Sequence, residues 1–223
     1  MRVFYLHGFA SSAQSSKARM FSERLDPYAI HLETPDFNQP SFQTLTITRM
    51  IEQTMSALGT SPLDHPDRVA FIGSSLGAFV AVHAAAQSCA PGRVPVERLI
   101  LLAPALDFAS NRMRDLGFEA IERWRETGQL HVFHYGYGRT MSVGYELYED
   151  AAKYDAFALN FSLPILIFQG TRDAVVDPDV AVRFARNRPN VTVRLLDDDH
   201  QLLQNLPIIW EESREFLKLP ASA

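Results

Sequence analysis

The chain has 223 residues, of which 47% are hydrophobic and 21% are charged, so it is long enough to form one globular domain with a substantial core. Its net charge of -5 argues against a nucleic-acid-binding protein, because such surfaces need clustered lysine and arginine. The lone cysteine, Cys89, excludes an internal disulfide and favours a reducing, cytoplasmic compartment.

The N-terminal half alternates short apolar runs with longer helical patterns. We expect strands at 3–6, 28–32, 69–72 and 99–102, and helices at about 15–25, 41–58 and 76–88. The longest weakly polar stretch, 69–90, carries glycine, serine, histidine and glutamine, so it fits a buried strand and helix rather than a membrane span. We expect no secretory signal, because the apolar run at 3–6 is too short for its core.

The same alternation returns near the C-terminus, with strands expected at 163–169 and 191–196 and helices at about 179–187 and 202–217. Strands separated by helices form parallel β-α-β units with right-handed crossovers. We therefore predict an α/β fold, with a doubly wound, mostly parallel six-stranded sheet, in a single domain spanning residues 1–223.

Residues 104–163 interrupt this rhythm between two core strands. A connection of this length is too long for a simple loop. It contains a predicted helix at 112–127 ended by Gly128, an apolar-aromatic segment at 131–135, a Gly-Tyr-Gly turn and a helix at 145–154. We predict that this insertion forms a small cap over the C-terminal edge of the strands.

The most informative segment is Gly73-Ser74-Ser75-Leu76-Gly77, which joins an apolar strand to an alanine-rich helix. In a G-x-S-x-G elbow, the central serine occupies a strained turn that presents its hydroxyl above the sheet edge. The two glycines leave room for that turn to approach neighbouring backbone. Ser75 is therefore the candidate nucleophile.

An acid and a histidine follow Ser75 in the chain order that a serine hydrolase on a doubly wound sheet uses. Asp173 lies just after a strong predicted strand, and His200 lies between the last strand and the final helix. Acyl transfer needs a base that takes the serine proton and an acid that holds the base in the right tautomer. We predict Ser75, Asp173 and His200 as the catalytic residues.

Alternatives to this assignment are present in the sequence. Asp107, after the fourth predicted strand, is the rival acid, whereas Asp177 is better placed to cap the following helix. The three aspartates 197–199 immediately precede His200. We interpret them as a solvated acidic turn, although any of them would favour an imidazolium if it approached the ring.

The other histidines are poorly placed for catalysis. His7 ends the first strand, and His83 lies within the elbow helix, where a packing role is expected. His131 and His134 have an i, i+3 spacing, but no trio of Asp, Glu or Cys lies nearby, so we predict no metal site.

The oxyanion hole is expected to use two backbone N–H groups, those of Leu76, which follows the nucleophile, and of Phe9, in the loop after the first strand. Gly8 permits this loop to turn its amides inward. No cofactor is expected, because the stretch 73–77 lacks the G-x-G spacing of a dinucleotide loop and no P-loop lysine follows.

The His-Gly, G-x-S-x-G and G-x-x-D motifs and the late histidine together resemble the α/β-hydrolase superfamily over nearly the whole chain. This resemblance implies an α/β-hydrolase fold that lacks the usual first antiparallel strands. Residues 5–12, Tyr-Leu-His-Gly-Phe-Ala-Ser-Ser, followed by Ser-Lys-Ala at 16–18, resemble the small YqiA-type esterases. That group implies hydrolysis of short acyl esters by Ser75, Asp173 and His200. The insertion at 104–163 is similar to the cap of acyl-protein thioesterases of the same fold.

The leading hypothesis is a serine carboxylesterase that cleaves small or medium acyl esters through an acyl-enzyme. An acyl-protein thioesterase is the alternative, because the insertion is rich in aromatic residues that could cover an acyl tail. A non-catalytic binding protein of the same fold is the least favoured hypothesis, because the serine, the histidine and the elbow glycines are all present.

Overall fold

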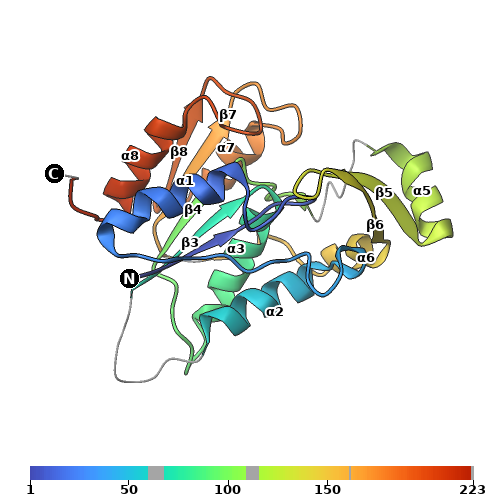
Figure 1. Ribbon diagram of the computed structural model, residues 1–223, viewed down its shortest axis with the longest axis horizontal. Helices are drawn as coiled ribbons and strands as arrows, with labels where there is room; N and C mark the ends of the chain where they lie inside the picture. The colour runs from blue at the N-terminus through green and yellow to red at the C-terminus, as the bar shows by residue number, and fades with distance from the viewer. Residues whose placement is uncertain (60–67, 109–115, 161, 222–223) are drawn as a thin grey trace.

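The computed structural model describes residues 1–59, 68–108, 116–160 and 162–221 (Figure 1). Six strands form one sheet in the order β2-β1-β3-β4-β7-β8, with every neighbouring pair parallel. This confirms the predicted α/β fold. The strands are Arg2–Leu6 (β1), Leu32–Glu33 (β2), Val69–Ser74 (β3), Arg98–Leu102 (β4), Ile165–Gly170 (β7) and Val191–Leu196 (β8).

The strand order reverses between β1 and β3. From β1 the chain moves outward to β2, and from β3 it moves in the opposite direction to β8. Open α/β sheets bind their ligands at such a switch point, beyond the carboxyl ends of the strands. The loops that follow β1 and β3 therefore define the expected position of a site.

The strand side chains alternate between two apolar layers. In β1, Phe4 and Leu6 belong to one layer and Val3 and Tyr5 to the other, as the period of two requires. The first layer is covered by α2 (Ile47–Leu58), α3 (Leu76–Ser88) and α7 (Asp179–Ala185), and the second by α1 (Ser16–Leu25) and α8 (Leu206–Phe216). Because both faces are covered, the central strands are nearly continuous apolar runs.

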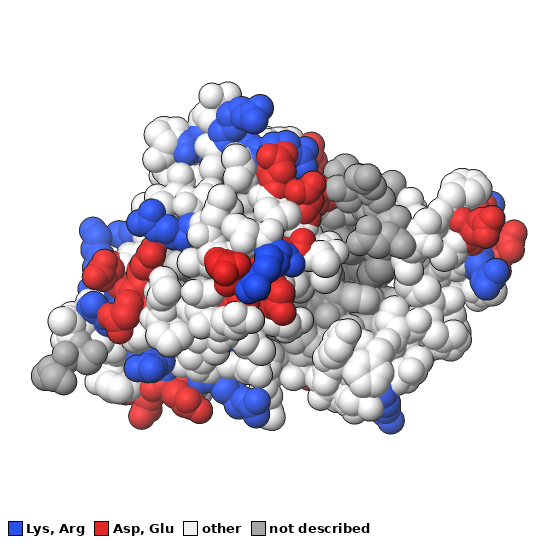
Figure 2. Space-filling view, turned by 90° about the horizontal axis from the view of Figure 1, so that it is seen from above, with Lys and Arg blue, Asp and Glu red and all other residues white. Residues whose placement is uncertain are grey.

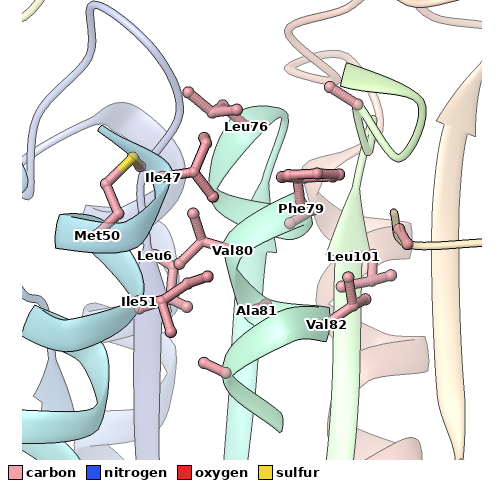
Figure 3. Close-up of a cluster of buried hydrophobic side chains, with 14 of the residues drawn as sticks. Leu6, Ile47, Met50, Ile51, Leu76, Phe79, Val80, Ala81, Val82 and Leu101 are labelled. Atoms are coloured by element: carbon pink, nitrogen blue, oxygen red, sulfur yellow. The ribbon is translucent and has the colours of Figure 1, made fainter. Parts of the chain in front are cut away.

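Helix α3 lies at the centre of the first layer and is apolar around its whole circumference, as expected of a fully buried helix. In Figure 3, Val80 lies near Leu6 of β1 and Ile51 of α2, and Val82 lies near Leu101 of β4. Burial of each such side chain stabilises the fold by about 1.5–3 kcal/mol. This packing fixes the start of α3, and hence Ser75, against the sheet.

Two predicted elements near the N-terminus differ from the structure. The strand expected at 28–32 is reduced to Leu32–Glu33, because 26–28 forms a 3-10 turn (η1) and Ala29 adopts a left-handed φ of 53°. The helix expected at 41–58 is split into a 3-10 turn at Phe42–Thr44 (η2) and α2. Helix α2 starts late because the Thr46 side chain accepts a hydrogen bond from the Arg49 N–H and caps it.

The insertion between β4 and β7 contains α5 (Gly117–Thr127), the antiparallel hairpin of β5 (Gln129–His134) and β6 (Arg139–Gly144), and α6 (Glu146–Ala151). The predicted helix at 112–127 is seen from residue 117, and its first residues lie outside the described ranges. Strand β6 was not predicted, because only two of its six residues, Met141 and Val143, are large and apolar. In Figure 1, α5 and the hairpin project away from the sheet, whereas α6 lies beside α2.

The insertion is anchored on the sheet domain by polar contacts. His134 at the end of β5 is buried, and its Nε2 lies 3.0 Å from the Asn38 amide oxygen. The buried Asp150 of α6 accepts hydrogen bonds from the N–H and the hydroxyl of Thr48, each at 2.7 Å. Within the insertion, the indole N–H of the buried Trp124 donates to the Val143 carbonyl at 3.1 Å.

His83 of α3 is expected to make the protein acid-sensitive. Its side chain is packed between the rings of Phe79 and Tyr154, and burial lowers its pKa from 6.5 to about 4, against a small opposing effect of the Asp155 charge. Between these two pH values the unfolded state binds a proton that the folded state excludes, so the free energy of unfolding falls as the pH falls. We expect His83 alone to account for about 2 kcal/mol of stability lost between pH 7 and pH 5.

Urea denaturation of the wild type and of His83→Leu at these two pH values measures this effect. The Leu variant should lose less stability on acidification by about that 2 kcal/mol, because it has no proton to bind in the unfolded state. Equal losses in both proteins would contradict the prediction.

Candidate active site

Ser75 occupies the turn between β3 and α3, with φ 53° and ψ -118°, a conformation that is strained for a residue with a side chain. The Ser75 N–H donates to the Leu102 carbonyl of β4 at 2.9 Å, which holds the turn in place. A glycine is required two residues later, at Gly77, because a Cβ there would lie 2.0 Å from the Leu6 carbonyl oxygen. The elbow thus depends on direct contact between the start of α3 and the end of β1.

A continuous chain of hydrogen bonds links Ser75, His200 and Asp173. The Ser75 Oγ lies 3.1 Å from His200 Nε2, and His200 Nδ1 lies 2.8 Å from Asp173 Oδ2. Residues far apart in sequence are brought together because each follows the carboxyl end of a parallel strand, β3, β7 or β8. The structure therefore brings together the three predicted catalytic side chains in the order nucleophile, base and acid.

The Asp173 carboxylate has no exposed side-chain surface, yet it is held in its ionised form. Burial by itself raises its pKa, but hydrogen bonds from His200 and from the N–H groups of Val176 and Val175 outweigh burial and lower the pKa below its usual value. Because the carboxylate accepts, His200 Nδ1 carries the proton. His200 Nε2 is then left to accept the Ser75 hydroxyl proton.

His200 lies in a turn that is tightly held against β7. A Cβ on Gly170 would lie 2.5 Å from the Asp198 carbonyl oxygen, so a glycine is needed for this approach. The Asp198 carboxylate is fully buried and accepts hydrogen bonds from the N–H groups of Asp199, Gln204 and Asn205.

The aspartates before His200 therefore only partly match the predicted solvated turn. Asp197 is exposed and paired with Arg172, and Asp199 is exposed, but Asp198 shapes the turn from inside. The carboxylate that contacts the His200 ring is that of Asp173. A run of identical residues could not indicate which of them points inward.

The loop after β1 lies beside the serine. His7 is buried, and its two ring nitrogens are bonded to the Gly8 carbonyl at 2.9 Å and to the Phe37 N–H at 3.1 Å. His7 must accept from Phe37, so it donates to Gly8 and fixes the plane of the Gly8–Phe9 peptide. Phe9 and Leu76 both border the cavity next to Ser75, and their role as oxyanion donors remains a prediction.

The rival candidates make other contacts. Asp107 faces Arg183, whose Nη2 is 3.8 Å from its carboxylate, and Asp177 accepts the N–H of Asp179 at the start of α7. His131 and His134 engage Ser142 and Asn38 respectively. Over the described ranges, no group of three or more His, Cys, Asp or Glu side chains could hold a metal ion.

A cavity of about 720 Å³ opens next to Ser75. Its walls are mainly apolar, from Phe9, Leu76, Ala105, Phe108, Leu116, Ala174, Val175, Val176 and Pro178, and the acidic residues Asp107, Asp173 and Asp177 also border it. Ligand sites are commonly mostly apolar hollows with a few polar groups. The face seen in Figure 2 carries acidic and basic side chains interspersed, and its described part has no continuous basic patch.

Sequence reasoning missed Gln169 as part of this arrangement. Its amide group is buried at the end of β7 and donates to Asp173 Oδ2 at 2.9 Å, next to the bond from His200. The available signal was a polar residue closing an otherwise apolar strand, because a buried amide needs a partner.

Comparisons with known proteins agree with this architecture. A model of a family described as "Uncharacterised protein family (UPF0227)" matches residues 2–212. No relative among the curated proteins matches the sequence. In the described part of the chain, no helix is both long enough and apolar enough to cross a membrane.

Several solved structures share the fold. A protein from Agrobacterium vitis S4 aligns with TM-score 0.83 and 23% identity, covering 96% of this chain and 87% of its own. Est1E from Butyrivibrio proteoclasticus aligns with TM-score 0.77 and 19% identity, covering 97% and 86%. Mouse alpha/beta hydrolase domain-containing protein 10 aligns with TM-score 0.77 and 19% identity, covering 98% and 90%.

Proposed function

This chain belongs to the UPF0227 family and has the α/β-hydrolase fold, and we propose that it is a serine hydrolase that cleaves carboxylic esters through an acyl-enzyme on Ser75. The observation that carries the proposal is the unbroken hydrogen-bond chain from the Ser75 hydroxyl through His200 to the ionised, buried Asp173. An ionised carboxylate at Nδ1 supports the histidine tautomer that nucleophilic catalysis by a serine uses.

In the first half of the proposed reaction, Ser75 Oγ attacks the ester carbonyl carbon while its proton passes to His200 Nε2. Asp173 stabilises the imidazolium that forms. The tetrahedral intermediate collapses as the C–O bond to the leaving group breaks, and Nε2 returns the proton to the departing alcohol. The acyl group remains on Ser75.

In the second half, a water molecule attacks the acyl carbon and gives its proton to His200 Nε2. Collapse of this second intermediate breaks the bond to Ser75 Oγ, which recovers the proton, and releases the carboxylic acid. In both halves we assign stabilisation of the oxyanion to the N–H groups of Phe9 and Leu76, which adjoin Ser75 at the switch point of the sheet.

We assign the acyl group to the cavity beside Ser75, because its walls are mainly apolar. We also propose that residues 104–163 serve as a cap, since Phe108 and Leu116 from this insertion contribute to the same cavity. The carboxylates of Asp107 and Asp177 on the wall favour neutral acyl groups over anionic ones, because like charges repel.

Thioester hydrolysis, as in acyl-protein thioesterases, is the second candidate, and it rests on the aromatic residues of the insertion. Trp124, Tyr145 and Tyr148 pack against one another, whereas Phe118 and Tyr135 are more than three-quarters exposed. Of the aromatic residues of the insertion in the described ranges, Phe108 lines the cavity. This distribution favours a short or medium acyl group over a long one.

A series of nitrophenyl esters tests the proposed function. We expect the highest kcat/KM for butyryl to octanoyl esters and a fall of about tenfold or more for palmitoyl, because a longer tail would leave apolar surface outside the cavity. Matched acyl thioesters, measured on the same preparation, distinguish the two candidates. A preference for palmitoyl thioesters would support the thioesterase, and no turnover of any ester or thioester would contradict both.

A further inference from the structure

Lys17 is a buried lysine in the first turn of α1. Ser15 is the N-cap of this helix, and its hydroxyl oxygen accepts the Ala18 N–H at 3.3 Å. The Lys17 side chain extends to the turn that carries His200, and only 8% of the residue is exposed. An ammonium group is costly to bury without partners, so its surroundings require an explanation.

The Lys17 ammonium donates a hydrogen bond to the Gln201 carbonyl at 2.8 Å, across 184 positions in the sequence. Gln201 directly follows His200. The next residue, Leu202, has a left-handed φ of 56° and is fully buried in the same apolar layer as Ala18 of α1. The His200 turn is thus connected to α1 by a charged hydrogen bond, next to a leucine that is buried in the same apolar layer as α1.

The electrostatic surroundings keep this ammonium charged at neutral pH. Burial lowers the pKa of Lys17 to about 8, and the negative charges of Asp199, Asp173 and Asp198 limit the fall. A hydrogen bond from a charged donor is shorter and about twice as strong as one between neutral groups. The bond to the Gln201 carbonyl is therefore a strong restraint on the backbone next to the base.

We propose that Lys17 is a positioning residue, which holds the Gln201 carbonyl so that His200 stays within hydrogen-bond reach of Ser75. This inference rests on the proposed function. The opposite side of the turn is held by Asp198 and by contact with Gly170. Without Lys17, the turn keeps these contacts and the buried Leu202 but loses the charged hydrogen bond at the Gln201 carbonyl.

Replacing Lys17 with methionine, which keeps an unbranched side chain but removes the donor and the charge, is expected to lower kcat by about 10- to 100-fold, since small misplacements of catalytic groups have effects of that size. KM for a nitrophenyl butyrate should stay within about twofold, because Lys17 does not line the cavity. Lys17→Arg, which keeps the charge and donors, should recover most of the lost kcat.

The matched control is Lys218→Met, which removes an exposed lysine just after α8, outside the insertion and the cavity wall, and should leave kcat unchanged. Proton NMR supplies a readout that does not depend on turnover: the downfield signal of the His200 Nδ1–H bonded to Asp173 should broaden or vanish in Lys17→Met. A folded Lys17→Met variant with wild-type kcat and an unchanged signal would overturn the proposal.

Two further comparisons make the outcome unambiguous. If Lys17→Met does not fold, Lys17→Arg and Lys17→Gln decide the question: kcat retained by Arg and lost by Gln supports positioning by the charged bond, and equal kcat in both contradicts it. Ser75→Ala is measured in parallel. If that variant keeps full activity, the proposed function itself fails, whereas loss there with full activity in Lys17→Met refutes the positioning role alone.

Discussion

Replacing Ser75 with alanine is expected to lower kcat for nitrophenyl butyrate by about 10⁴- to 10⁶-fold, the range found when members of a Ser-His-Asp triad are removed. The variant lacks the atom that forms the acyl-enzyme, and His200 then has no hydroxyl to deprotonate. The fold should be unaffected, because the Ser75 N–H keeps its bond to Leu102 and the elbow glycines remain. Stopped-flow and steady-state assays with background hydrolysis subtracted measure the loss.

The neighbouring Ser74 provides a matched control. It ends β3 and is nearly buried, so Ser74→Ala removes a hydroxyl one residue away without touching the proposed nucleophile. A fluorophosphonate probe should label the wild type and Ser74→Ala once, at Ser75, and should not label Ser75→Ala. Turnover within tenfold of wild type in a folded Ser75→Ala variant would show that catalysis, if present, uses another group.

Much of the sheet could be predicted from the sequence because its strands are covered on both faces. The run 99–102 is apolar without interruption, so neither its position nor its burial was ambiguous. The edge strand β2 could not be placed in the same way, because only two residues pair with β1 and the local backbone is governed by the turn at 26–29. Strand β6 was missed because it contains few apolar residues, and its pairing with β5 is what makes it a strand.

The residues of the candidate site also fall into a group that the sequence could predict and a group that it could not. Ser75, Asp173 and His200 each lie just after a strand that the sequence marks clearly, so their convergence could be predicted from chain order alone. Gln169, Asp198 and Lys17 could not be assigned, because their roles arise from contacts between segments that are remote in sequence. A sequence pattern indicates which residues can do chemistry, whereas the residues that orient them emerge from packing.

Asp173→Asn is expected to lower kcat by about 10⁴-fold. The same Asp→Asn change has an effect of this size in a Ser-His-Asp triad, because it reverses the tautomer of the histidine. The reason is that the two carboxylate oxygens of Asp173 have different partners. Asp173 Oδ1 accepts the N–H groups of Val175 and Val176, at 2.8 and 2.9 Å. An asparagine must place its oxygen there, because its NH₂ group cannot accept those two donors.

The NH₂ group of the asparagine then faces His200 and donates to Nδ1. The imidazole must carry its proton on Nε2, so it points a donor at the Ser75 hydroxyl and can no longer act as the base. Asp179→Asn, an exposed acid on α7 paired with Arg183, is the control and should keep kcat within about twofold. In Asp173→Asn, Gln169, whose amide donates to Oδ2 in the wild type, must turn its unpartnered amide oxygen toward the new NH₂ group. Substrate KM should change little in this variant, since the Asp173 side chain has no exposed surface. A kcat within tenfold of wild type would mean that His200 takes its tautomer from another group, and the assignment of Asp173 as the acid would fail.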